Sequence, residues 1–185
     1  MKRDIENKIR KAALLLFLRR HRYPGVREWE LKKYLGEKYR DIINLLDERI
    51  KPLGFKVKSV KVNDSEYYAI VISSPIESKE FKSYGWRIDE MAVLAVTISY
   101  ILSRGGSARR EEIEEILEEK IPKWRIERGL ERFVRMGYLE EEDTYIKLGV
   151  RSYIEFDLEK LISLLIGAKE DTITDTSQEE RPSQP

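Results

Sequence analysis

The sequence predicts an α+β protein, mostly α-helical, in which the same order of elements occurs twice. In each half of the chain, stretches with apolar residues at three- and four-residue spacing precede two short runs of aromatic and β-branched residues. The spaced stretches indicate helices, and the paired runs around a polar turn indicate a β-hairpin. The halves lack obvious sequence similarity, so the repetition concerns the order of elements alone.

Three helices are predicted in the first half. The first covers residues 5–22, and its long apolar run exceeds what a one-sided surface helix needs. The second covers residues 26–35, with Trp29 and Leu35 expected to face inward. The third covers residues 38–53, and its inward face is formed by Tyr39, Ile43, Leu46, Ile50 and Leu53.

A hairpin follows these helices. Strands are predicted at residues 55–62 and 67–72, with a polar turn at 63–65. The alternation of apolar and polar residues changes phase near Ser59, which predicts a β-bulge there. Three helices and a hairpin together make a winged helix.

The second half repeats this order. A strongly apolar helix is predicted at residues 88–102, and Ser107 is expected to cap an acidic helix at 108–120. The third helix begins at Pro122 and ends at Gly137, because a glycine readily adopts the left-handed conformation that ends a helix.

A second hairpin and a further helix complete the pattern. Strands are predicted at residues 138–139 and 145–148, and an amphipathic helix ends near Ile166. The sequence therefore predicts two winged-helix domains in tandem. A first domain, a linker, a second domain and a disordered tail are expected at residues 1–73, 74–85, 86–167 and 168–185.

The second hairpin and its flanks resemble the second winged helix of the KITE proteins. The matching residues are Gly137, Tyr138, Leu139, Leu148, Gly149, Arg151 and Glu155. KITE proteins are tandem winged-helix subunits that bind the kleisin of SMC chromosome complexes. The match looks best to the first and third non-SMC elements of the five/six complex, the third being the MAGE-like branch. The resemblance implies a chain that dimerises and binds a kleisin-type segment. The zinc-binding RING of the first element is not implied, because this chain has no cysteine.

The composition favours a cytoplasmic protein from a hot environment. Charged residues make up 37% of the 185 residues, cysteine is absent, and glutamine and asparagine are rare. No apolar run is long enough for a membrane span, and no secretory signal is evident. The charge is uneven: residues 1–61 hold 18 Lys and Arg against 8 Asp and Glu, whereas residues 84–166 hold 13 against 17. Two halves of opposite charge indicate different partners.

Catalysis and cofactors are not expected. The single histidine, His21, has no nucleophile or metal ligand at useful spacing, and Gly105-Gly106 lacks the lysine of a phosphate-binding loop. The glutamates at residues 111–119 are typical of a solvated helix face, because hard cations need oxygens from several elements. We predict no catalytic residue, no metal and no cofactor.

The basic first half suits weak, non-specific binding of double-stranded DNA. Winged helices often read bases with the third helix, but here Asp41, Asp47 and Glu48 would oppose phosphate. Phosphate contacts are expected instead from the first helix and first wing. The residues are Lys8, Arg10, Lys11, Arg19, Arg20, Arg22, Lys56, Lys58 and Lys61. The alternative is a basic face that serves solubility alone.

A stripe of arginines runs along the surface of the last helix before the second hairpin. Arg125, Arg128, Arg132 and Arg135 are spaced by three, four and three residues, opposite the apolar face. Two interpretations stay open. Either the glutamates at residues 111–119 neutralise the stripe, or it binds an anion such as DNA phosphate or an acidic partner segment.

Both domain-opening helices carry more apolar surface than one small domain covers. We expect a homo- or heterodimer, with packing of one domain on the other as the alternative. The interface residues predicted are Leu15, Leu16, Leu18, Val93, Val96 and Tyr100.

The sequence thus favours a nucleoid-associated, non-catalytic subunit of an SMC-type complex for chromosome organisation or repair. The alternative is a winged-helix transcription regulator or basal transcription factor, since the fold alone does not decide function. The acidic third helix favours the first interpretation.

Overall fold

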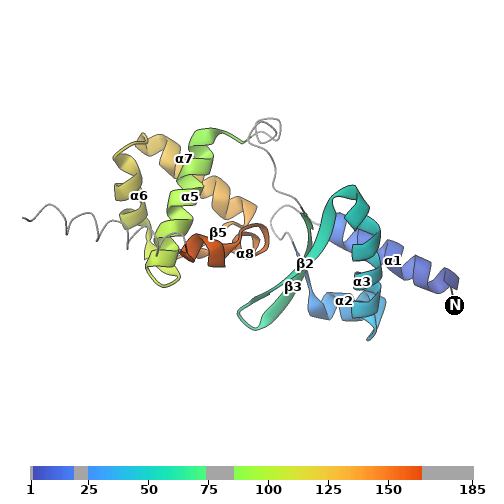
Figure 1. Ribbon diagram of the computed structural model, residues 1–185. Coiled ribbons are helices and arrows are strands. Elements are labelled where there is room, and N and C mark those ends of the chain that lie inside the picture. Colours follow the sequence, from blue (N-terminus) through green and yellow to red (C-terminus); the bar gives the residue numbers. More distant parts are fainter. Residues whose placement is uncertain (1, 19–24, 74–85, 164–185) are drawn as a thin grey trace, which may run out of the picture.

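The computed structural model describes residues 2–18, 25–73 and 86–163 (Figure 1). It is an α+β structure, mostly helical, with two small antiparallel sheets. We call the described elements before residue 74 the first unit and those after residue 85 the second unit. The predicted linker and tail lie outside the described residues. No described helix is long and apolar enough to cross a membrane.

The first unit packs three helices on a three-stranded sheet of order β1-β3-β2. Its elements are α1 (Lys2–Phe17), β1 (Val26–Arg27), α2 (Glu28–Leu35), α3 (Tyr39–Ile50), the 3-10 turn η1 (Lys51–Leu53), β2 (Phe55–Val62) and β3 (Ser65–Ile72). Buried apolar residues of α1, α2 and α3 form its core, with the fully buried Ala12 and Leu31 at its centre. The predicted helices and hairpin are therefore present.

Two inward positions predicted for this unit are wrong. Val26 belongs to a strand that pairs with Tyr68, so α2 begins only at Glu28. Leu31 and Leu35 then face the core, and Trp29, two residues before Leu31, faces solvent. Leu53 is also exposed, because α3 ends at Ile50 and the chain turns before Leu53 can reach the core.

The predicted bulge at Ser59 is absent, and the change of phase has another cause. The β2–β3 pairing runs without interruption from Phe55↔Ile72 to Val62↔Ser65. Phe55 and Val57 pack on the core of the first unit. Val60 and Val62 lie on the opposite face, against a cluster that joins Tyr67 and Ala69 to Val150 and Ile154 of the second unit. The sheet is therefore covered on both faces, and apolar residues occur on both.

The second unit has the same layout, with sheet order β4-β6-β5. Its elements are α5 (Ile88–Ser103), β4 (Ser107–Arg109), α6 (Arg110–Glu118), α7 (Lys123–Met136), β5 (Leu139–Glu142), β6 (Tyr145–Leu148) and α8 (Val150–Glu155). Ser107 does not cap α6. It belongs to β4, where it pairs with Lys147 of β6, and Arg109 is the residue before the helix. The predicted last helix is divided, because the chain leaves α8 at Phe156 and is helical again over residues 158–163.

Helix α8 of the second unit docks on the β2–β3 hairpin of the first (Figure 1). Val150 and Ile154 of α8 are buried against Tyr67 and Ala69 of β3. Lys58 of β2 donates hydrogen bonds from Nζ to the carbonyl oxygens of Tyr153, Ile154 and Phe156, at 3.1, 2.7 and 3.3 Å. A cation at this helix end satisfies carbonyls that have no partner within the helix and faces the negative end of its dipole. Burial lowers the pKa of Lys58.

The residues of the KITE resemblance hold α8 in place. Gly137, at φ 81°, ends α7, and its carbonyl accepts a 3.1 Å hydrogen bond from the amide of Arg151. The Tyr138 carbonyl accepts hydrogen bonds from the Gly149 amide (2.8 Å) and from Ser152 Oγ (2.7 Å). Glu155 accepts from the Tyr138 hydroxyl and from Arg151. In this chain the motif ties the end of α7 and the strands β5 and β6 to the start of α8.

Gly149 leaves no room for a side chain. Its φ of −80° suits any residue, but a Cβ there would lie 2.3 Å from the Gly137 carbonyl oxygen. We expect Gly149→Ala to lower the free energy of unfolding by about 3 kcal/mol, because the two backbones must separate. Urea unfolding measures this.

The matched control is Gly105→Ala. A Cβ at Gly105 meets nothing within 4 Å, but the φ of 79° is unfavourable for alanine. That variant should cost about 1 kcal/mol. Equal stability of the two variants would contradict the steric explanation.

Candidate partner-binding groove

A groove with a cavity volume of about 860 Å³ lies between α5 and α6. We call it the α5–α6 groove. Ile88, Ala92 and Val96 follow one another at four-residue spacing on α5 and line one wall. Ile116 and Ile121 line the other. Ile88 is 72% exposed, and Val96 and Ile116 are about two-fifths exposed, so the apolar walls face solvent.

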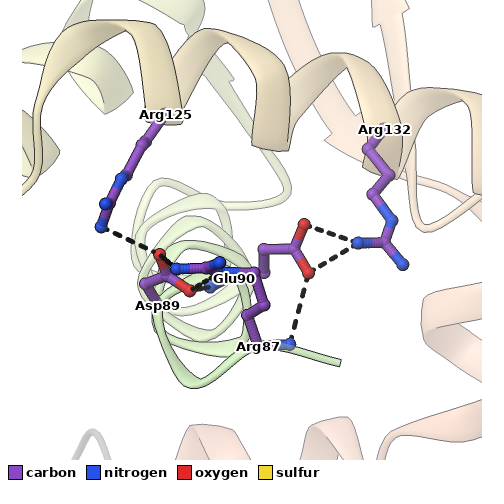
Figure 2. A network of polar contacts seen from close by, with 5 residues as sticks. All are labelled: Arg87, Asp89, Glu90, Arg125 and Arg132. Atoms are coloured by element: carbon purple, nitrogen blue, oxygen red, sulfur yellow. Dashed lines mark hydrogen bonds and ion pairs between the residues drawn. The ribbon is translucent and has the colours of Figure 1, made fainter. Parts of the chain in front are cut away.

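Arg87, Asp89 and Arg125, which line this groove, belong to an ion-pair network with Glu90 and Arg132 (Figure 2). Asp89 accepts hydrogen bonds from Arg87 Nε at 3.0 Å and from Arg125 Nη1 at 3.1 Å. The hydrogen bond from Arg87, first of all, holds the pKa of Asp89 below its usual range, so the carboxylate stays ionised. Arg132 Nη1 binds both oxygens of Glu90, at 2.5 and 2.6 Å. The network thus joins the first turn of α5 to α7.

A smaller hollow of about 180 Å³ lies beyond this network. We call it the Trp124 hollow. Arg87, Asp89, Ile121 and Arg125 line both hollows, so the two are neighbours that share a wall. Trp124, which is 59% exposed, and Arg128 line only the smaller one.

The structure divides the arginine stripe into paired and unpaired residues. Arg125 and Arg132 are paired with Asp89 and Glu90 of α5. The glutamates of α6 do not neutralise the stripe, so that interpretation is wrong. Glu114, for example, pairs with Arg110 on its own helix. Arg128 and Arg135 are exposed and have no carboxylate partner among the described residues.

The basic residues of the first unit fall into three groups. Arg10, Lys11, Lys56 and Lys61 are exposed, whereas Lys8 is half-buried and lies 3.5 Å from Asp4. Lys58 is engaged with the carbonyls of α8, so its assignment as a DNA contact is corrected. Arg19, Arg20, Arg22 and His21 lie outside the described residues.

The predicted interface residues are not all on the surface. Leu16 and Val93 are buried in the cores of their own units, and Leu15 and Tyr100 are half-buried. Only Leu18 and Val96 are exposed, and Val96 lines the α5–α6 groove. The long apolar runs of α1 and α5 do not indicate an interface with another chain. Each helix contacts several elements of its own unit, and these contacts cover more than one of its faces.

No metal site is brought together in the described part of the chain. Its Asp and Glu residues form no cluster of three suited to a metal ion. The sequence prediction missed the groove as a whole, because its walls come from separate helices. The four-residue spacing of Ile88, Ala92 and Val96 was the available signal.

Comparison with known proteins identifies a related architecture. No protein-family model and no curated protein matches this chain. A solved chain of the Nse1-Nse3-Nse4 complex has a similar structure, with a TM-score of 0.60, 18% sequence identity and 92% of each chain covered. The similarity extends over both units. This chain therefore shares the fold of a chain of the Nse1-Nse3-Nse4 complex, and the resemblance to KITE proteins is confirmed at the level of the fold.

Proposed function

We propose that this chain is a non-catalytic subunit of an SMC-type complex, built from two winged helices in tandem. In this proposal the α5–α6 groove binds a segment of a kleisin-type partner. The observation that carries it is the apolar wall of the groove, formed by Ile88, Val96 and Ile116, which nothing in the described structure covers. The similarity to a chain of the Nse1-Nse3-Nse4 complex, along most of its length, supports the choice of complex.

The groove has the form that helical segments use. An apolar channel between two helices accepts a partner helix whose side chains project at three- and four-residue spacing. Ile88, Ala92 and Val96 extend over two turns of α5, which matches the spacing of such side chains. A contiguous exposed apolar surface on a single chain commonly marks a binding site.

The exposed face of α3 argues against a sequence-specific regulator. Asp41 and Glu48 lie on that face beside the half-exposed Leu45. Asp47 is engaged by the Val57 amide at 2.5 Å, and so serves the fold. Carboxylates at the base-reading position would oppose the phosphate backbone.

Self-association is assigned to α1 in this proposal. Leu14, Phe17 and Leu18 are exposed apolar residues near the end of this helix, and Leu18 is 74% exposed. A dimer that covers this surface would remove it from water. Sedimentation at micromolar concentration tests the assignment, and a monomer throughout would contradict it.

Val96→Glu should weaken partner binding, because a carboxylate would be buried without a partner in the apolar groove. The tagged full chain, expressed in cells of its source, should recover a kleisin-type chain and an SMC ATPase. We expect recovery by the variant to fall at least roughly tenfold, measured by quantitative mass spectrometry.

Ala95→Glu is the matched control, since Ala95 is the exposed neighbour on α5 and does not line the groove. It should recover both partners normally. The proposal fails if the wild-type chain recovers no SMC-complex component, or if both variants behave alike.

Duplex DNA should bind weakly and without sequence preference through the first unit. Replacing Lys56 and Lys61 by Ala should reduce the slope of log affinity against log salt by up to about 1.8, since each phosphate contact contributes about 0.9. Fluorescence anisotropy with two unrelated duplexes measures this. Arg128→Ala, in the second unit, should leave the slope unchanged. Binding of one duplex only, or equal loss in all variants, would contradict the prediction.

A further inference from the structure

The ion-pair network beside the α5–α6 groove has more cations than carboxylates. Arg87 and Arg125 both bind Asp89, so two guanidinium groups share one carboxylate. Glu90 does not compensate, because Arg132 occupies both of its oxygens (Figure 2). The groove therefore borders a site with a surplus of positive charge.

Arg128 adds to this surplus. It lines the Trp124 hollow together with Arg87 and Arg125, and it has no carboxylate partner in the described part of the chain. Exposed guanidinium groups bind carboxylates in paired, parallel hydrogen bonds. These hydrogen bonds are stronger where an apolar neighbour excludes water. The indole of Trp124 is such a neighbour, with the Arg125 guanidinium 5.1 Å from its centroid.

The shape of the surface favours a protein segment over a nucleic acid. The Trp124 hollow is small, and it shares a wall with the α5–α6 groove, whose solvent-facing surface is mostly apolar. A phosphate backbone has no row of apolar groups to fill those walls. An amphipathic helix has one, and can carry charge at its end as well.

We propose that the α5–α6 groove takes an amphipathic helix with an apolar stripe and carboxylates at the one end that lies over Trp124 and Arg128. The apolar stripe fills the groove, and the carboxylates of the helix neutralise the positive charge that Asp89 alone leaves unbalanced. This inference rests on the proposed function only in assigning the groove to a partner segment. It holds for any protein partner of that chemistry.

The test begins with a displayed library of 16-residue peptides, selected on the full chain after subtraction on Val96→Glu. The most enriched peptide is then synthesised with a fluorophore and titrated against the folded variants in an anisotropy assay. We expect Asp or Glu at one end of the enriched peptides. Arg128→Glu should weaken binding about tenfold, because attraction becomes repulsion at the rim of the site.

Arg135→Glu is the matched control. Arg135 lies on the same helix, is also exposed and unpaired among the described residues, and lines neither hollow. This variant should bind within about twofold of the wild type. A second peptide, with Lys in place of the acidic residues, should bind Arg128→Glu about tenfold better than the first peptide does.

Three results would overturn the inference. If groove-dependent peptides bind Arg128→Glu and Arg135→Glu with the same affinity, the claim of an acidic end on the partner is contradicted. The proposed function is then unaffected. Displacement of the peptide by a 20-base-pair duplex whose binding depends on Arg128 and not on Arg135 would assign the hollow to nucleic-acid phosphate. No enrichment over Val96→Glu would remove both the inference and the groove as a partner site. Recovery of a partner outside SMC complexes would instead contradict the proposed function alone.

Discussion

The contact on which the rest of the structure depends is the docking of α8 on the first sheet. Lys58 donates to three carbonyls at the end of α8, and Val150 and Ile154 cover the outer face of β3. Because α8 is itself fixed to α7 and the second hairpin through Gly137 and Gly149, this one short helix connects the core of the second unit to the wing of the first.

This connection explains where sequence-based prediction succeeded and where it did not. Long periodic segments such as α3 and α7 were predictable, because their apolar spacing reflects a core within one unit. The short strands β1 and β4 were not, since two or three residues carry no period. The phase change at Ser59 was visible in the sequence, but its cause lies some ninety residues away, in α8. A strand covered on both faces by different units imitates a bulge.

The candidate site was predictable only in part. The arginine stripe was correctly placed on the surface of α7, but its carboxylate partners come from α5, which no spacing within α7 or α6 could indicate. Lys58 has the sequence context of an exposed basic wing residue and instead lies under α8. Of the apolar residues assigned to an interface, Leu16 and Val93 belong to the cores, because the composition of a helix does not show how many neighbours cover it.

The direct measurement of the central structural claim is hydrogen exchange of α8 in Lys58→Met, which keeps the length of the side chain and removes its charge. The amides of residues 150–155 should exchange at least roughly tenfold faster than in the wild type, since hydrogen bonds from a charged donor are worth more than about 1 kcal/mol. Lys56→Met, on the same strand and exposed, should match the wild type. Unchanged protection of α8 in Lys58→Met would contradict the claim that this contact holds the two units together.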